Sequence, residues 1–285
     1  MSGSDAISPT AHYTGYVWAR NGLSHPALTT TEGRLLFASL EPVMLASRAV
    51  GGPSLERYLL ARHRAIDARL EAAIESGQVS QVIEVAAGLS PRGWRFTERY
   101  GDRLTYIEAD LPAMAARKRS ALERMASLGE RHQVRDVDAL RDGGPLSLSA
   151  LAGELDQAAG LAIITEGLLG YVSPGDLEAL WRRFATVLGG FAGGCYLSDL
   201  HLRSAQTPEV RVFRLLLAAF VRGGVYLHFA DAAEAERRLR QAGFTSATVT
   251  PADRLITDPD ERPKGKGGQM AHILEASTEL SKRAR

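Results

Sequence analysis

The feature that most constrains the fold of this chain is an alternation of short β-type runs with longer helical patterns, which begins near Gly77. The runs cover residues 81–86, 104–109, 132–137, 161–166, 195–200, 247–252 and 271–276. Segments with helical spacing lie between the middle runs, as in the apolar residues from Leu177 to Leu188. Such alternation predicts an α/β fold with a mainly parallel, seven-stranded sheet covered by helices on both faces.

Two helices carry boundary signals. In "SPGD" (173–176), Ser173 is a helix cap, Pro174 takes the first helical position and Asp176 completes the capping pattern, while Gly189 marks the stop. The stretch 54–77 reads as one long helix closed by Gly77.

The two ends of the alternation differ from its middle. Residues 1–76 contain no convincing strand, and 201–230 include a helical pattern after the fifth strand. We therefore predict a helical prefix or cap (1–76), an α/β core that binds the ligand (77–200), a helical insertion of the cap (201–230) and the completion of the core with a C-terminal tail (231–285). The two helical additions either cap a binding cleft or cover a sheet edge.

Composition excludes several classes of function. The 34 basic and 33 acidic side chains leave a net charge of +1, which disfavours a nucleic-acid partner. The single Cys195 can form neither an internal disulfide nor a thiolate zinc cluster, so no metal is expected. The polar N-terminus lacks a signal-peptide pattern, and no apolar run approaches the roughly 20 residues of a membrane span. The expectation is a cytoplasmic protein, monomeric or homodimeric.

Carboxylates follow the predicted strands. Glu108 and Asp110 end the second, Asp136 the third and Glu166 the fourth, with no basic counterpart nearby in sequence. In a doubly wound sheet, ligands bind outside the carboxyl ends of the strands, and a carboxylate after the second strand typically accepts hydrogen bonds from ribose hydroxyls. The alternative is that these acids cap the helices that follow.

The turn after the first strand, "AAGLSPRG" (86–93), limits the class of ligand that this edge of the sheet could bind. Dinucleotide-binding turns need several glycines, and this one has only Gly88 well placed, together with Pro91. A phosphate-free nucleoside with a positive charge suits an acid-lined cleft better, and S-adenosylmethionine is such a molecule. Ala86, Ala87 and Gly88 let a ligand approach the backbone, and Glu84 is expected to be either interior scaffolding or a group that supports a ligand-binding residue.

Arg62 interrupts the apolar stripe of the long helix. A buried arginine needs an anion, since an unpaired one costs several kcal/mol. The anion is either the carboxylate of S-adenosylmethionine or one of the chain's own carboxylates; the third alternative is that Arg62 extends its charged end to solvent.

Four ordered motifs carry a resemblance to a known family: "YLLARHRAID", "QVIEVAAGLSPRGWRF", "YIEADLPAMAARKR" and "IITEGLLGYVSPGDL". Over about residues 55–200 the chain resembles the leucine carboxyl methyltransferase family, which includes tetracenomycin-type polyketide O-methyltransferases. The resemblance implies a Rossmann-like class I methyltransferase fold and S-adenosylmethionine as cofactor.

The resemblance also implies roles for single residues. Arg62 is expected on the methionine carboxylate, Asp110 on ribose and Glu166 near the amino group. The turn from Ala86 to Gly88 matches the family's glycine-containing turn, and Asp136 with Val137 matches the pair near adenine.

Two departures concern the turn. The family's "GAG(L/M)DTR" reads "AAGLSPRG" here, so Ala86 replaces the first glycine and Ser90-Pro91 replaces Asp-Thr. Alanine can hold the same backbone if its φ is negative.

The predicted function is O-methylation of a carboxylate or phenolic hydroxyl of a small molecule, such as a polyketide or other secondary metabolite. A carboxylate with a pKa of about 4 needs no general base, whereas a phenol with a pKa of about 10 needs a base or a cationic neighbour. Tyr171, His201 and Arg203 are candidate catalytic residues on the acceptor side, and His228 is more typical of a structural histidine. The aromatic residues of 13–18 form either a lid or an arm that packs on a partner subunit.

Two other function classes remain open. A nicotinamide-dependent oxidoreductase uses a similar sheet, although the missing glycines disfavour it. A non-catalytic protein that binds S-adenosylmethionine would keep the same residues.

Overall fold

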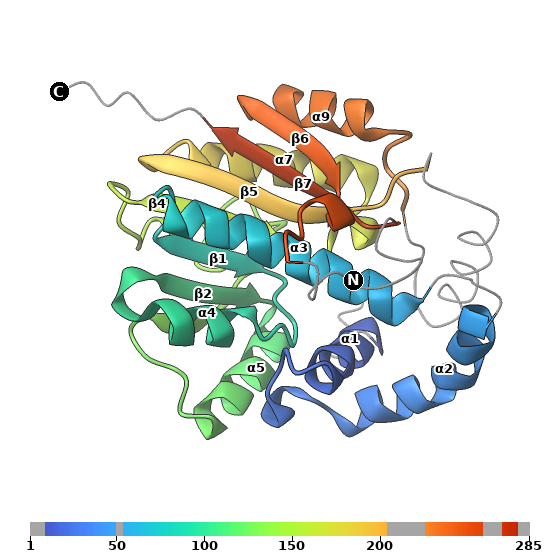
Figure 1. Cartoon of the computed structure of the whole chain (residues 1–285). Helices are drawn as coiled ribbons and strands as arrows, with labels where there is room; N and C mark the ends of the chain where they lie inside the picture. Colours follow the sequence, from blue (N-terminus) through green and yellow to red (C-terminus); the bar gives the residue numbers. More distant parts are fainter. Residues whose placement is uncertain (1–8, 50–53, 204–225, 259–269, 279–285) are drawn as a thin grey trace.

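The computed structural model describes residues 9–49, 54–203, 226–258 and 270–278. Within these ranges the chain forms one seven-stranded sheet with the order β3-β2-β1-β4-β5-β7-β6 (Figure 1). The strands are β1 (Gln81–Val85), β2 (Thr105–Asp110), β3 (His132–Asp136), β4 (Gly160–Thr165), β5 (Gly193–Leu200), β6 (Ser246–Pro251) and β7 (His272–Thr278). Strands β1 to β5 are parallel, and β7 runs antiparallel to both β5 and β6.

All seven predicted strands are confirmed, each within two residues at either end. The central strands read as continuous apolar runs because they are buried on both faces; every residue of β1 is buried. Strand order reverses between β1 and β4, where two connections leave in opposite directions. This topological switch point is where a doubly wound sheet binds its ligands.

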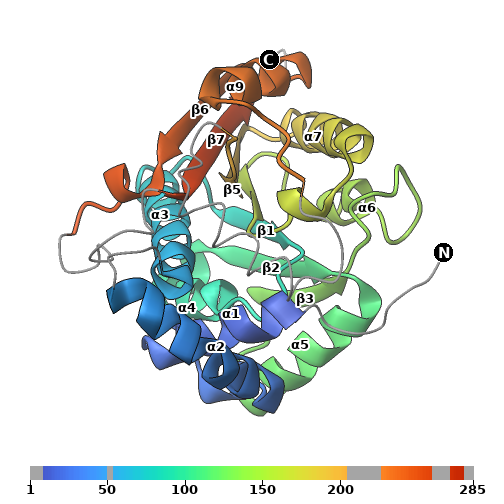
Figure 2. The same cartoon turned by 90° about the vertical axis from the view of Figure 1, so that its right-hand side faces the viewer.

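Helices cover both faces of the sheet. One face carries α3 (Leu55–Glu75), α4 (Arg92–Tyr100) and α5 (Pro112–Arg124), and the other carries α6 (Leu148–Ala152), α7 (Pro174–Leu188) and α9 (Ala232–Gln241). Figure 2 shows α3 and α7 on opposite sides of the strands. The predicted caps are confirmed for α7, where the backbone N–H of Asp176 donates to Ser173 Oγ at 3.3 Å. Helix α3 begins after Ser54, and Gly77 follows it with a φ of +75°.

The prefix consists of α1 (Pro9–Arg20), the short helix η1 (Pro26–Leu28) and α2 (Thr31–Ala49), followed by α3. Figures 1 and 2 show α1 on the side toward which the arrowheads of β1 and β2 point. There α1 packs on the loop after β1, since a Cβ added at Gly15 would lie 3.2 Å from Leu89 Cβ. The helical prefix therefore reaches the edge where ligands bind.

Aromatic rings hold α1 in the interior. Tyr13 stacks on Phe37 of α2 with 5.7 Å between ring centroids, and Trp18 lies against His63 of α3 at 4.7 Å. Both Tyr13 and Trp18 are buried in this chain alone. The predicted arm on a partner subunit is therefore wrong for these two rings, because they pack in the chain's own core.

Most of the predicted insertion, residues 204–225, lies outside the described residues, as do 259–269 within the last predicted segment. Among the residues that the structure describes, no helix is both long and apolar enough to cross a membrane.

Leu28 anchors the prefix on the α/β core. It is fully buried and packs with Ala115, Leu122 and Val134 of α5 and β3. We expect Leu28→Ala to lower the free energy of unfolding by about 2–5 kcal/mol in urea titrations, because it leaves a cavity at this junction. Leu35→Ala on the exposed side of α2, where the leucine is 62% exposed, should change it by less than about 0.5 kcal/mol. Similar values for both variants would mean that the prefix does not unfold together with the core.

Candidate functional site

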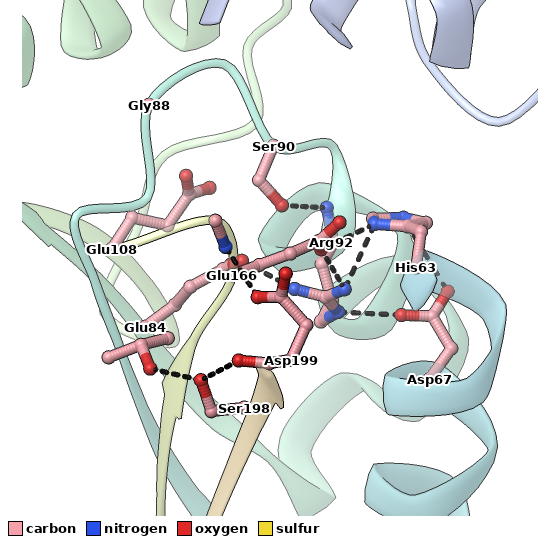
Figure 3. Close-up of polar contacts among 12 residues, drawn as sticks. His63, Asp67, Glu84, Gly88, Ser90, Arg92, Glu108, Glu166, Ser198 and Asp199 are labelled. Atoms are coloured by element: carbon pink, nitrogen blue, oxygen red, sulfur yellow. Dashed lines mark hydrogen bonds and ion pairs between the residues drawn. The ribbon is translucent and has the colours of Figure 1, made fainter. Parts of the chain in front are cut away.

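The candidate site lies at the carboxyl ends of β1, β2, β4 and β5, on both sides of the switch point. Its parts are the loop 86–91 after β1, Asp110 at the end of β2, the turn of Glu166 and Gly167 after β4, and Asp199 near the end of β5. Figure 3 shows side chains from these strands and from α3 and α4 converging on one place.

The loop after β1 makes a tight turn with two residues in the left-handed region. Ala86 has a φ of +55° and Gly88 a φ of +53°. The condition under which alanine would hold this backbone without strain, a negative φ, is therefore not met at Ala86. Its backbone keeps the conformation that glycine adopts freely, at a steric cost of roughly 1–2 kcal/mol for alanine.

Asp110 fastens this loop from the side of β2. Its Oδ2 accepts the N–H of Gly88 at 2.7 Å, and its Oδ1 accepts the N–H of Leu111 at 2.8 Å. Burial raises the pKa of Asp110, while the two backbone hydrogen bonds act in the opposite direction. A carboxylate has about four lone-pair positions, so Asp110 can still accept two hydrogen bonds from a diol.

Lys118 of α5 contacts the loop after β1 from the protein interior. Its side chain is 1% exposed, and its Nζ donates to Ser90 O at 2.5 Å and is ion-paired with Glu108 of β2. His132 Nε2 of β3 lies 2.7 Å from the other oxygen of Glu108. Burial alone would raise the pKa of Glu108, but Lys118 and His132 lower it. Glu108 is therefore a structural anion beneath the loop.

A second buried cation, Arg92, was missed by the sequence analysis. Its side chain is fully buried, and it donates from Nε to Asp67 Oδ1 at 2.6 Å, from Nη1 to Glu84 Oε1 at 2.5 Å and from Nη2 to Glu166 Oε2 at 2.6 Å (Figure 3). Arg92 directly follows the loop after β1, yet the strand-end acid that it pairs with, Glu166, lies 74 residues further along the chain. Glu84 is interior, as predicted.

His63 of α3 completes this cluster. Its Nδ1 lies 2.8 Å from Glu166 Oε2 and 2.9 Å from Arg92 Nη2. Burial would raise the pKa of Glu166, but the charges of His63, Arg92 and Arg62 outweigh it and hold that pKa well below the ordinary value. Glu166 is therefore an anion at neutral pH.

Arg62 lies in the site and is paired with the chain's own carboxylates. Its Nε donates to Glu166 Oε1 at 3.0 Å and its Nη1 to Asp199 Oδ2 at 3.3 Å. Burial would lower the pKa of Arg62, but Asp199 and Glu166 raise it above the ordinary value. Of the three alternatives left open, the internal ion pair is the one in this structure, and Arg62 is buried rather than extended to solvent.

Asp199 is the other functional candidate that the sequence analysis missed. It is 3% exposed, and besides Arg62 it accepts the N–H of Gly167 at 2.6 Å and the hydroxyl of Tyr58 at 3.4 Å. The sequence does carry a signal for Asp199, because it lies near the end of the fifth predicted strand. Asp110, Asp136 and Glu166 were selected for the same position in their strands.

Asp136 and Val137 lie beside Asp110. Arg119 Nη2 donates to Asp136 Oδ1 at 3.0 Å, and the buried Val137 donates its N–H to Asp110 O at 2.8 Å. These residues connect the ends of β2 and β3.

The three candidate acceptor residues each bond to a different part of the chain. Tyr171 is 42% exposed, and its hydroxyl lies 3.1 Å from Thr10 Oγ1 of α1. His201 Nε2 lies 2.7 Å from the hydroxyl of Tyr58, next to Arg62 on α3. Arg203 donates to Leu227 O at 2.9 Å and lies 3.7 Å from Glu234 of α9.

Two further expectations concern structural groups. His228 Nε2 lies 2.9 Å from Leu169 O, as a structural histidine would, and burial lowers its pKa. Within the described part of the chain, no cluster of His, Cys, Asp and Glu side chains is arranged to hold a metal ion.

Comparison with known proteins points to one family. The profile of the leucine carboxyl methyltransferase family matches residues 28–185, which is more than half of the 285-residue chain. A protein of Mycobacteroides abscessus described as an S-adenosyl-L-methionine-dependent methyltransferase is 30% identical over 134 residues. That stretch covers 47% of this chain and 41% of the relative, so the match spans less than half the length of either protein.

Two solved structures share the fold over nearly the whole chain. A protein of Thermobifida fusca YX described as a methyltransferase aligns with a TM-score of 0.68 at 13% identity, covering 96% of each chain. A DUF574 family protein of Streptomyces avermitilis MA-4680 aligns with a TM-score of 0.69 at 13% identity, covering 95% of this chain and 98% of that one. At this identity the likeness shows the fold alone.

The strained turn gives a stability prediction. We expect Ala86→Gly to raise the free energy of unfolding by up to about 1 kcal/mol, because relief of the left-handed strain exceeds the entropy that glycine loses on folding. Ala87→Gly is the matched control; Ala87 is not among the described residues with positive φ, so glycine there should lower stability by roughly 0.5–1 kcal/mol. Chemical denaturation measures both. A loss of stability in Ala86→Gly would contradict the strain.

The buried cluster gives a pH prediction. Burial would raise the pKa of Asp67, but His63, Arg92 and Arg95 lower it from 3.8 to about 2. A carboxylate whose pKa is lowered by folding stabilises the protein above its unfolded pKa, and that contribution is lost as the pH falls from about 4 to about 2. The shift corresponds to roughly 2 kcal/mol.

Unfolding free energies of the native protein and of Asp67→Asn, measured from pH 6 to pH 2, test this. The variant should have the lower free energy of unfolding at pH 6. The difference between the native protein and the variant should shrink by about 2 kcal/mol as the pH falls to 2. Parallel curves would show that Asp67 does not titrate between the two limits.

Proposed function

The chain belongs to the leucine carboxyl methyltransferase family, and from that premise we propose that it is an S-adenosylmethionine-dependent O-methyltransferase. The proposed acceptor is a carboxylate or phenolic hydroxyl of a small molecule, such as a polyketide or another secondary metabolite. The observation that carries the proposal is that Arg62 and Glu166 lie as a cation and an anion at the switch point, with Asp110 and the Gly88 turn across from them.

The nucleoside end of the cofactor fits the groups around Asp110. Two lone-pair positions of Asp110 remain for the ribose diol, and Gly88, which lacks a side chain, leaves its backbone open to close approach. We propose that Ala86 and Gly88 line the nucleoside and that Asp136 and Val137 lie near adenine. A diol and a neutral base suit this side of the site, where described cations such as Arg119 and Lys118 are already paired.

The amino-acid end of the cofactor fits Arg62 and Glu166. This end carries one carboxylate and one ammonium group, so it needs one cation and one anion at close range. The guanidinium of Arg62 and the carboxylate of Glu166 supply this pair, and both are held in their charged forms by their neighbours. Charge-assisted hydrogen bonds of this kind are the stronger ones in proteins.

When bound, S-adenosylmethionine supplies an electrophilic methyl group whose leaving thioether is neutral. The protein therefore needs no acid for the leaving group, and alignment of the acceptor carries most of the catalysis. A carboxylate acceptor is already ionised at neutral pH, whereas a phenol must lose its proton to a base or be stabilised by a cation.

We propose Tyr171 and His201 as groups that contact the acceptor. Tyr171 follows β4, which borders the switch point, and His201 follows the next strand, β5, where it is held by Tyr58 one helical turn from Arg62. Arg203 also stays a proposal, but it would reach an acceptor only after releasing Leu227 and Glu234.

The wider expectations also stay proposals. We propose that residues 1–76 and 201–230 cap the cleft of the core, which 77–200 and 231–285 form. We further propose a small molecule rather than a nucleic acid as partner, a monomer or homodimer, and a cytoplasmic location.

A non-catalytic protein that binds S-adenosylmethionine is the second candidate, since Arg62, Asp110 and Glu166 serve binding alone equally well. Incubation with S-adenosylmethionine labelled in its methyl group, together with aromatic acids and phenols, separates the two candidates. Label that base hydrolysis releases is a carboxyl ester, and label that resists it is an aryl ether. A protein that binds the cofactor but labels no acceptor would favour the binding role.

Asp110→Ala and Glu166→Gln test the cofactor site. We expect each to weaken calorimetric binding of S-adenosylhomocysteine at least tenfold, about 1.4 kcal/mol, because each removes a charged hydrogen-bond acceptor. Glu154→Gln, whose carboxylate is 54% exposed in a pair with Arg135, is the control and should bind normally. Unchanged affinity in both site variants would reject the site assignment.

A further inference from the structure

Asp199 uses both of its carboxylate oxygens to join two parts of the site. Oδ1 accepts the N–H of Gly167, the residue that follows Glu166, at 2.6 Å. Oδ2 accepts a hydrogen bond from Arg62 Nη1 at 3.3 Å. The side chain is 2% exposed. One anion thus contacts both the turn that carries Glu166 and the guanidinium that Glu166 binds.

The turn after β4 lies against Arg62. Gly167 has a φ of +71°, and a Cβ at this position would lie 3.1 Å from Arg62 Nη2. A side chain there would be strained and would also crowd the guanidinium. The hydrogen bond from Gly167 to Asp199 therefore fixes how the turn and the guanidinium meet.

The ion pair between Arg62 and Glu166 can open without leaving a buried charge alone. Glu166 would keep Arg92 Nη2 at 2.6 Å and His63 Nδ1 at 2.8 Å. Arg62 would keep Asp199. Removal of one partner usually leaves an uncompensated buried charge at a cost of about 3–5 kcal/mol, and the second partners avoid that cost here.

We propose that Asp199 is a positioning residue for cofactor binding by ion-pair exchange. The amino-acid end of the cofactor replaces the bond between Arg62 and Glu166: its carboxylate binds Arg62, its ammonium binds Glu166, and Asp199 keeps Arg62 and the Gly167 turn in place. This inference rests on the proposed function. The exchange breaks the ion pair between Arg62 and Glu166 and forms one ion pair from each of them to the cofactor. Because the amino-acid end is zwitterionic, it adds no net charge to the buried site.

Tyr58 supports the same arrangement from α3. Burial and the charge of Asp199 raise the pKa of Tyr58, so its hydroxyl stays protonated and donates to Asp199 Oδ2 at 3.4 Å. The guanidinium of Arg62 lies over the Tyr58 ring, 5.6 Å from its centroid. Arg62 is therefore held by a carboxylate and by a ring, neither of which belongs to the pair that opens.

Asp199→Asn tests the proposal, because the amide keeps the shape of the side chain and removes its charge. Binding is measured by calorimetry for S-adenosylhomocysteine and for 5′-methylthioadenosine, a thioether nucleoside without the amino-acid end, with competition titrations for the weaker ligand. We expect at least a tenfold loss for S-adenosylhomocysteine and less than a twofold change for 5′-methylthioadenosine. With a neutral amide beside it, Arg62 binds Glu166 alone, and the cofactor carboxylate must compete for it.

Ser198→Ala is the matched control. Ser198 is the buried neighbour of Asp199; its hydroxyl accepts from Thr165 Oγ1 and donates to the backbone oxygen of Asp199, but it does not bond to the Asp199 carboxylate, so both ligands should bind normally. Should Asp199→Asn fail to fold in thermal melts, Tyr58→Phe replaces it, since phenylalanine keeps the ring beside Arg62 and removes the hydroxyl that donates to Asp199 Oδ2. It should show a selective loss in the same direction.

The outcomes separate this inference from the function on which it rests. Native protein that binds neither ligand would reject the proposed function. The role of Asp199 alone would be overturned if the native protein binds S-adenosylhomocysteine and the folded variant binds it equally well. It would also be overturned if the variant loses affinity for both ligands by the same factor.

Discussion

The buried guanidinium of Arg92 is the interaction on which the rest of the site depends. It joins carboxylates from three separate elements: Asp67 of α3, Glu84 of β1 and Glu166 after β4. None of these acids is stable as an isolated charge in the interior, and neither is the arginine. The four groups therefore hold each other in place, and they fix α3 and α4 against the sheet at the switch point. Glu166 is the member of this cluster that also faces the candidate cofactor site.

The geometry of the candidate site follows from that cluster. Since Arg92 and His63 already compensate Glu166, Arg62 can share its charge between Glu166 and Asp199. On the other side of the switch point, Asp110 and Lys118 hold a loop in which Ala86 adopts a left-handed backbone. Strain of this kind persists only where the surroundings over-determine the conformation. The proposed zwitterion site at Arg62 and Glu166 and the proposed diol site at Asp110 thus lie on either side of the switch point.

Much of this arrangement could be predicted from the sequence. The seven strands were found because apolar runs of a few residues, bounded by turn residues, indicate buried strands locally. Asp110 and Glu166 were selected because the carboxyl ends of parallel strands share one edge. Arg92 was missed, because a basic residue after a turn looks like a solvated one until its burial is known. Asp199 was missed although it obeys the rule that selected Glu166, since the rule says where a residue lies and nothing about its partners.

The sequence by itself determined the order and type of the elements, the family motifs and the residues at the strand ends, because these depend on local periodicity and spacing. The tertiary structure alone decided which charges pair, that Arg62 binds Glu166 and Asp199, and that Ala86 takes a positive φ. Ion pairs join residues as far apart as Arg62 and Glu166, which meet only when α3 packs on the sheet. The energy of a charge depends on its burial and its neighbours, and both are properties of the folded chain.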